Sequence, residues 1–198
     1  MRAPPRKLTE KFTYKDYLSW TDENERWELI DGTAYDMSPA PSRRHQRILL
    51  LLAKIISEIT DKGQCETSIA PFDVRLTEAS KTGDTISDED VSTVVQPDIS
   101  VFCHSEVLDD AGAHGAPDLI VEILSPSTGY KDQTVKLALY EKHQVKEYWL
   151  VNGDIPNVMV YRLGTDGLFN KPDYYRIDES VKSTVLAGEE IPLALFIR

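Results

Sequence analysis

Residues 119–127, LIVEILSPS, begin with a run that is apolar on both alternating faces of an extended chain except at Glu122. A strand buried between two layers has this pattern, whereas a strand with one exposed face alternates apolar and polar residues. Ser125 and Pro126 end the run, and we expect a helix over residues 131–143 beyond them. The stretch therefore predicts a central strand that leads into a helix.

Other elements follow on either side of this strand. Apolar residues recur every three or four positions over residues 42–62, which predicts an amphipathic helix that ends before Gly63. Asp31-Gly32 joins two strand-like runs and favours a tight hairpin. Besides the helices 42–62 and 131–143, the predicted elements are a short helix at 13–21, the hairpin strands 26–30 and 33–37, extended structure at 64–76, and strands at 97–102, 118–124, 147–151, 158–161 and 174–177. This order indicates a mixed α+β or α/β protein with one central sheet.

The length of 198 residues favours a single domain over residues 1–198. We expect residues 1–12 to form a flexible N-terminal arm and residues 77–95, which are rich in Asp, Glu, Ser and Thr, to form a long acidic loop. The chain has 22 Lys and Arg against 33 Asp and Glu, a net charge of −11. This charge argues against a surface that binds phosphate everywhere but allows a local basic cleft.

The two cysteines, Cys65 and Cys103, form neither a metal-ligand pair nor a dense disulfide framework. We therefore predict two buried thiols in a reducing compartment. The first residues lack the apolar stretch of a secretion signal, and the apolar runs are too short to cross a bilayer. The expected location is the cytoplasm.

Two carboxylates are the candidate metal ligands. Glu122 interrupts an apolar strand, and Asp98 begins another one. A buried carboxylate needs a partner or a raised pKa, so Glu122 has two interpretations of equal weight, a structural salt bridge or a functional group. Two acids on neighbouring strands suit a hard divalent ion, Mg²⁺ or Mn²⁺. His45 and His143 have no Cys or second His at ligand spacing, which argues against a zinc site.

Two further groups of residues remain open to alternative interpretations. Asp132, Lys136 and Tyr140 share one helix face, either as an exposed ion pair beside a half-buried tyrosine or as a lysine aimed at a metal-bound water or a scissile phosphate. Arginines surround His45 at the start of the helix 42–62, where they either contact phosphate or only solvate the surface. The candidate nucleic-acid-binding residues are Arg43, Arg44, His45 and Arg47.

An ordered set of these motifs resembles the Uma-two family, which is similar to the PD-(D/E)XK nuclease superfamily. The set covers roughly Thr13 to Tyr161 and comprises Trp27-Glu28-Leu29-Ile30-Asp31-Gly32, His45, Pro97-Asp98, Val121-Glu122-Ile123-Leu124-Ser125-Pro126-Ser127, Asp132 with Lys136 and Tyr140, and Glu147-Tyr148-Trp149-Leu150-Val151. The resemblance implies a restriction-endonuclease-like core with a central mixed sheet flanked by helices. It also implies a DNA endonuclease dependent on Mg²⁺ or Mn²⁺, acting on duplex DNA as a homodimer.

The same resemblance assigns roles to individual residues. Asp98 and Glu122 match the metal-binding acids, and Glu28 matches an early acid that completes the site. The superfamily lysine is replaced by Leu124, so its role passes to Lys136, with Asp132 and Tyr140 in support. Gln144 stands where the family tends to have glycine.

Two other functions use the same residues. The negative charge, Leu124 and the acidic loop favour an interaction module that has kept the nuclease fold without catalysis. A metal-dependent hydrolase of another phosphate ester would need the same ligands.

Overall fold

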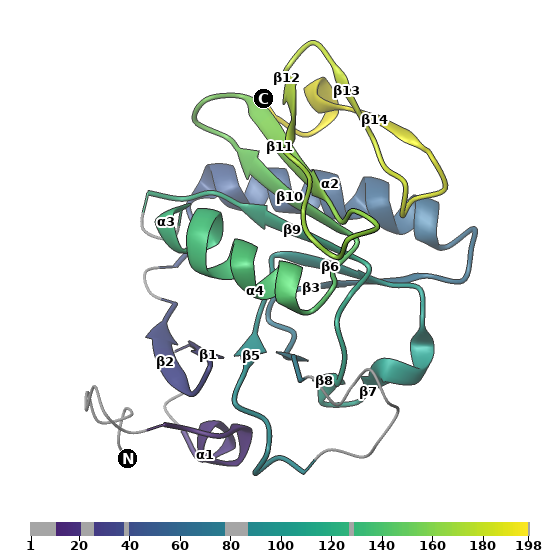
Figure 1. Ribbon diagram of the computed structural model, residues 1–198. Helices are drawn as coiled ribbons and strands as arrows, with labels where there is room; N and C mark the ends of the chain where they lie inside the picture. The colour runs from purple at the N-terminus through teal and green to yellow at the C-terminus, as the bar shows by residue number, and fades with distance from the viewer. Residues whose placement is uncertain (1–10, 21–25, 38–39, 78–86, 127–128, 198) are drawn as a thin grey trace. The chain divides into compact units, whose positions relative to one another are not determined.

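The computed structural model describes residues 11–20, 26–37, 40–77, 87–126 and 129–197 (Figure 1). The contacts divide the chain into two compact units. The first contains residues 1–40, 72–96 and 107–115, and the second contains residues 41–71, 97–106 and 116–198. The single domain over residues 1–198 stays a prediction. No helix in the described ranges has the length and apolar character needed to cross a membrane.

The first unit contains a six-stranded sheet in the order β2-β1-β5-β4-β8-β7. The predicted hairpin is confirmed, with Asp31 and Gly32 at φ angles of 46° and 75° in the turn. Thr13 caps the first helix in a capping box with Asp16. The elements are α1 (Tyr14–Leu18), β1 (Trp27–Ile30), β2 (Thr33–Asp36), β4 (Val74–Arg75), β5 (Val94–Val95), β7 (Leu108–Asp109) and β8 (Gly112–Ala113).

Two predictions for this unit are partly wrong. The N–H of Phe12 donates to the carbonyl of Gly32, so the predicted arm does not extend to residue 12. The predicted loop 77–95 ends in β5, which pairs with β1 and β4, and Val91 and Val94 belong to the core. Burial of these two apolar side chains in the core is energetically more favourable than their exposure in a solvated loop. Residues 1–10 and 78–86 of the two predicted segments lie outside the described residues.

The second unit contains a six-stranded sheet in the order β12-β11-β10-β9-β6-β3. The predicted central strand is confirmed, because β9 lies between β6 and β10 and all its residues are buried. It is parallel to β10 and antiparallel to β6, so the sheet is mixed. The strands are β3 (Glu66–Ile69), β6 (Ile99–Phe102), β9 (Leu119–Ile123), β10 (Glu147–Asn152), β11 (Asn157–Arg162) and β12 (Asp173–Arg176).

Helices cover both faces of this second sheet (Figure 1). The predicted long helix is confirmed as α2 (Arg43–Thr60), which begins at the N-cap Ser42 and packs its apolar side against Val121 and the other residues on that face of the sheet. On the opposite face, Glu122 contacts the helical segment made of α3 (Gly129–Lys131), the π-helical turn η3 (Asp132–Lys136) and α4 (Leu137–Lys142). The buried strand β9 therefore has a helix on each side.

The C-terminal part adds a small sheet that the sequence did not predict. It consists of β13 (Ser180–Lys182) and β14 (Glu190–Pro192), followed by the 3-10 turn η4 (Leu193–Leu195), and another such turn, η2 (Ser105–Val107), follows β6. The carboxylate of Glu147, which is fully buried, accepts hydrogen bonds from Ser183, Thr184, Trp149 and Arg162. Glu147 thereby connects this part of the chain to β10.

The prediction of two separate buried thiols is wrong. Cys65 and Cys103 form a disulfide and are each only half-buried. Glu66 pairs with Phe102 at the end of the antiparallel β3–β6 ladder, and the cysteines occupy the next position on each strand. Antiparallel pairing therefore brings together two residues that are 38 positions apart in the sequence. Their spacing along the chain contains no sign of this contact.

Candidate active site

Asp98 and Glu122 come from opposed positions on neighbouring strands of the second unit. Ile99 pairs with Val121 in the antiparallel register of β6 and β9, and the same register extended by one residue places Asp98 opposite Glu122. The main-chain N–H of Ile123 donates to Asp98 Oδ2 over 2.7 Å. The strand pairing thus fixes the positions of the two acidic residues relative to each other along the backbone.

Asp98 has one engaged oxygen and one open oxygen. Oδ2 also lies 3.0 Å from His45 Nε2, which comes from the first turn of α2. The side chains of His45 and Asp98 are 10% and 16% exposed. Within the described residues, Oδ1 of Asp98 has no hydrogen-bond partner. This oxygen is therefore available to an ion or a water molecule.

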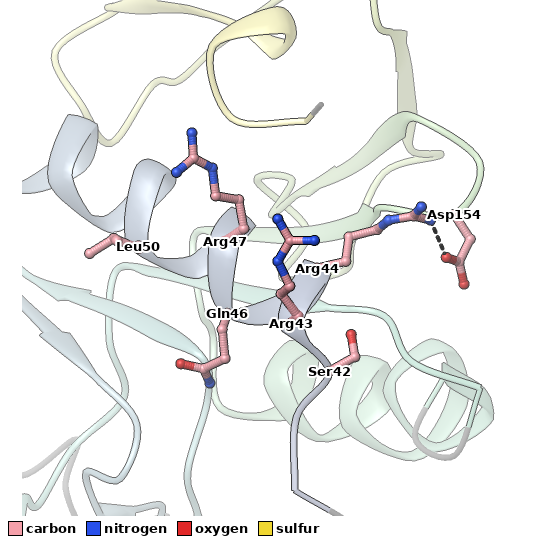
Figure 2. A pocket seen from close by; sticks show the side chains of 7 residues that line it. All are labelled: Ser42, Arg43, Arg44, Gln46, Arg47, Leu50 and Asp154. Atoms are coloured by element: carbon pink, nitrogen blue, oxygen red, sulfur yellow. Dashed lines mark hydrogen bonds and ion pairs between the residues drawn. The ribbon is translucent and has the colours of Figure 1, made fainter.

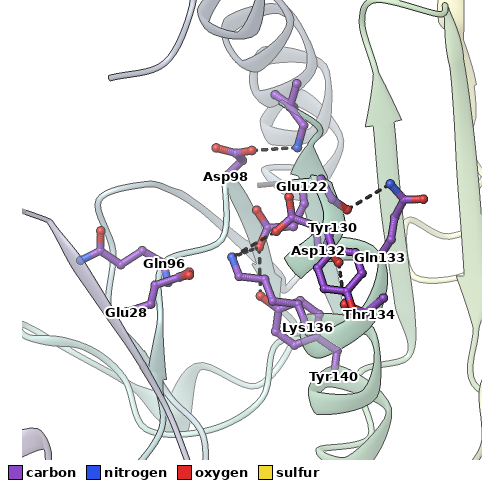
Figure 3. A network of polar contacts seen from close by, with 12 residues as sticks. Glu28, Gln96, Asp98, Glu122, Tyr130, Asp132, Gln133, Thr134, Lys136 and Tyr140 are labelled. Carbon is purple, nitrogen blue, oxygen red and sulfur yellow. Dashed lines mark hydrogen bonds and ion pairs between the residues drawn. The ribbon is translucent and has the colours of Figure 1, made fainter. Parts of the chain in front are cut away.

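Glu122 is the centre of a buried polar network (Figure 3). Its Oε1 accepts a hydrogen bond from Lys136 Nζ over 2.6 Å and another from the Tyr140 hydroxyl over 3.0 Å. Asp132 Oδ1 lies 3.8 Å from the same ammonium. All four residues are buried. The structure thus brings together Glu122, Lys136, Tyr140 and Asp132 as the sequence predicts, and the alternative of an exposed Asp132–Lys136 pair beside a half-buried tyrosine is wrong.

The lysine lies in a π-helical turn rather than in a regular α-helix. The turn spans Asp132–Lys136 and runs directly into α4. The Tyr148 hydroxyl on β10 donates to the main-chain carbonyl of Asp132 over 3.0 Å. Burial, followed by the nearby carboxylate of Glu122, raises the pKa of Tyr148 well above its usual value, so this hydroxyl stays a donor. Such turns occur frequently at functional sites, and helical periodicity alone does not reveal them.

Glu28 belongs to the other compact unit. It is fully buried on β1, and its Oε1 accepts a hydrogen bond from the main-chain N–H of Gln96 over 3.1 Å (Figure 3). Gln96 precedes Asp98 by two positions in the chain. A role for Glu28 in a metal site with Asp98 and Glu122 stays a prediction.

The structure divides the predicted nucleic-acid-binding group into two parts. Arg43, Arg44 and Arg47 line a cavity of about 1190 Å³ together with Ser42, Gln46, Leu50 and Asp154 (Figure 2). Arg44 forms an ion pair with Asp154 at 2.6 Å. His45 contacts Asp98 instead, because a helix with 3.6 residues per turn directs it away from Arg43 and Arg47, each two residues distant. The three arginines therefore line the cavity, whereas the histidine contacts the candidate metal ligand Asp98.

The donor set fits one hard divalent ion that keeps part of its water shell. Within the described part of the chain, no group of three or more His, Cys, Asp or Glu side chains could hold a metal ion. Mg²⁺ usually binds through one or two carboxylates and retains several water molecules. Asp98, with an open oxygen, and Glu122 supply two carboxylates of this kind. Zinc prefers nitrogen and sulfur ligands, so two carboxylates are a poor zinc site.

Comparisons with known proteins agree with this architecture. The crystal structure described as a "putative nuclease belonging to DUF820", from Anabaena variabilis, superposes with a TM-score of 0.72 at 20% identity and covers 94% of this chain and 97% of its own. This likeness confirms the predicted mixed α+β, nuclease-like fold. An uncharacterized protein of Synechocystis sp. is 26% identical over 159 residues, which are 79% of this chain and 77% of that protein.

The sequence model of the Uma2 family, described as "Putative restriction endonuclease", matches residues 14–194. The match extends beyond the motifs between Thr13 and Tyr161 and includes the C-terminal strands. The family description supports a nuclease. The chain therefore belongs to the Uma2 family, as its ordered motifs predict.

Proposed function

We propose that the protein is an endonuclease that hydrolyses phosphodiester bonds in duplex DNA with a Mg²⁺ or Mn²⁺ ion held by Asp98 and Glu122. The observation that carries the proposal is the buried contact of Lys136 and Tyr140 with Glu122, on the strand next to Asp98. Three groups from a strand and a helix converge there although no single motif contains them. A nuclease fold and the family description support the same reaction class.

Each residue of the site has a role in this proposal. The bound ion would supply an acidified water molecule and offset negative charge on the phosphate. Asp98 and Glu122 would hold it, whereas a role for Glu28 stays a prediction. Tyr140 fixes the orientation of the Glu122 carboxylate, since its hydroxyl donates to Oε1. Asp132, 3.8 Å from Lys136, keeps the ammonium close to the acid.

Lys136 takes the place of the strand lysine of the superfamily. Leu124, two residues after Glu122, has no charge to offer. Lys136 reaches the same acid from the helix, and its Nζ lies 2.6 Å from Glu122 Oε1. A buried ammonium in this position can orient the attacking water or stabilise charge on the phosphate, because electrostatic interactions are stronger where water is excluded. This displaced lysine favours catalysis over the non-catalytic interaction module.

The cavity on α2 is the proposed contact for the DNA backbone. It contains three guanidinium groups, of which Arg44 is paired with Asp154. Arginine binds phosphate with two parallel hydrogen bonds, so Arg43 and Arg47 suit a phosphodiester chain. Because they lie on the other side of α2 from His45, we assign them to phosphates other than the scissile one. The homodimer stays a prediction.

The test is cleavage of a supercoiled plasmid by wild-type protein, by Glu122→Gln and by a matched control, Glu58→Gln. Glu58 is an exposed acid on α2 that pairs with Lys54. We expect nicking by the wild type and the control that requires Mg²⁺ or Mn²⁺ and stops with a chelator, and loss of nicking in Glu122→Gln. Equal nicking by all three proteins would exclude the site, and no nicking by any of them would favour the interaction module or a different phosphate ester.

A further inference from the structure

Among the described residues, the ring of His45 makes one polar contact, which is with Asp98. Its Nε2 lies 3.0 Å from Asp98 Oδ2, and its side chain is nine-tenths buried. The ring comes from α2, whereas Asp98 precedes β6, so the contact depends on how the helix packs on the sheet. His45 is 53 residues away from Asp98 in the sequence.

The contact directs the carboxylate of Asp98. Both donors, His45 Nε2 and the N–H of Ile123, are on Oδ2. A carboxylate oxygen only accepts hydrogen bonds, which assigns the proton of the ring to Nε2. With Oδ2 held by two donors from different elements, rotation of the carboxylate is restricted and Oδ1 keeps one direction. Carboxylates that bind metals are commonly held by such outer hydrogen bonds.

The other ring nitrogen shows that this histidine is poorly suited to a purely structural role. Nδ1 is buried and has no hydrogen-bond partner within the described residues. A buried polar atom without a partner destabilises the folded state. A leucine would fill the same space on α2 without this penalty, and leucine is also a better helix former than histidine. The benefit of the imidazole must therefore lie in its contact with Asp98.

We propose that His45 is a positioning residue that orients Asp98 for a divalent ion through the hydrogen bond from Nε2. The inference rests on the proposed function, since it concerns the same metal site. It separates His45 from the arginines around it and gives it no contact with the substrate.

The experiment compares Mn²⁺ binding by calorimetric titration with thermal unfolding in the absence of metal. The variants are His45→Leu, which removes the donor, and His45→Gln, whose amide nitrogen can occupy the position of Nε2. Glu58→Gln on the same helix is the control. We expect the dissociation constant to rise by about 10- to 100-fold in His45→Leu. Binding by His45→Gln and the control should stay close to wild type, and the melting temperature of His45→Leu should not fall.

The outcomes distinguish this inference from the proposed function. If the wild type binds Mn²⁺ and His45→Leu binds it equally well, the positioning role is overturned and the metal site remains. Equal losses of affinity in His45→Leu and His45→Gln would also overturn it, because the hydrogen-bond donor that glutamine retains would then make no difference to metal binding. If the wild-type protein binds no Mn²⁺, the metal site itself is excluded, together with any residue that positions it.

Discussion

The stability of the folded protein depends on the charge balance of the buried ion pair between Lys136 and Glu122. The two side chains are only 3% and 6% exposed, so neither charge is solvated by bulk water. Removing one member of a buried pair leaves the other charge uncompensated, which is more destabilising than removing both. Asp132 Oδ1 lies 3.8 Å from the same ammonium, so the loss of the lysine changes the surroundings of two carboxylates.

We therefore expect Lys136→Met to lower the free energy of unfolding in urea by about 3–5 kcal/mol in a metal-free buffer. The double variant Lys136→Met/Glu122→Gln should regain a large part of this loss, because an uncharged amide then replaces the Glu122 carboxylate. The measurement is equilibrium unfolding of both variants beside the wild type. Unchanged stability in Lys136→Met would contradict the buried ion pair.

The sequence predicts most of the residues in the network but not all of their contacts. The acid within an apolar strand and the polar helix face leave two interpretations open, and the family resemblance implies the one that agrees with the contacts of Lys136 and Tyr140 with Glu122. The contact of His45 with Asp98 depends on the packing of α2, which no local pattern specifies. The separation of His45 from Arg43 and Arg47 is, in contrast, implied by helical periodicity.

At the level of the elements, long and periodic segments are predictable and very short ones are not. The hairpin and α2 appear where turn chemistry and amphipathic periodicity place them. The strands β5 and β13 have two and three residues, too few to show alternation. Gln144 adopts a φ of 61° after α4, a conformation that suits the glycine expected there. Its side chain donates to the carbonyls of Glu141 and Gly167, which helps to hold this helix exit.

The disulfide joins the ends of β3 and β6 and closes a long loop. With 38 positions between the two cysteines, the loss of entropy in the unfolded chain predicts a stabilisation of about 4 kcal/mol. A reductant should lower the free energy of unfolding by about this amount in the wild type. The double variant Cys65→Ser/Cys103→Ser should be equally stable with and without reductant. An equal response of both proteins to the reductant would rule out this effect.

Buried tyrosines in the first unit predict a loss of stability at high pH. Burial, and next the carboxylate of Asp73, raise the pKa of Tyr14 from 10.0 to about 12. The folded state thus keeps a proton that the unfolded chain releases, so this contribution is complete below pH 10.0 and is lost as the pH rises towards about 12. Two pH units correspond to about 3 kcal/mol. Tyr14→Phe should lose correspondingly less stability than the wild type in urea unfolding over this range, and equal losses would contradict the assignment.

For the molecule as a whole, the order of the predicted elements indicates the fold class, whereas composition does not locate the proposed binding surface. The mixed sheet with helices agrees with the element order, whereas the net charge of −11 does not show where three arginines line one cavity. The charge describes the sum over the surface, and DNA contact depends on local fields. The disulfide is likewise not predicted, since it depends on strand register rather than on cysteine content.

The proposed DNA contact has a consequence for the effect of salt. Each arginine that neutralises a phosphate releases counterions, so the double variant Arg43→Ala/Arg47→Ala should flatten the plot of log affinity against log salt by about two units. The measurement is fluorescence anisotropy of a labelled duplex in a buffer with a chelator. Arg176→Ala, which removes an exposed arginine on β12 paired with Asp178, is the control and should keep the wild-type slope. If the double variant keeps it too, the cavity does not bind the DNA backbone.

The central claim is that Asp98 and Glu122 hold a divalent ion, and calorimetric titration of Mn²⁺ into the wild-type protein and Asp98→Asn tests it most directly. The amide of the variant retains an oxygen that can accept from the N–H of Ile123, so the strand pairing should survive. The account predicts saturable binding by the wild type and its loss in Asp98→Asn. Absence of binding by the wild type, or binding of equal strength by both proteins, would contradict it.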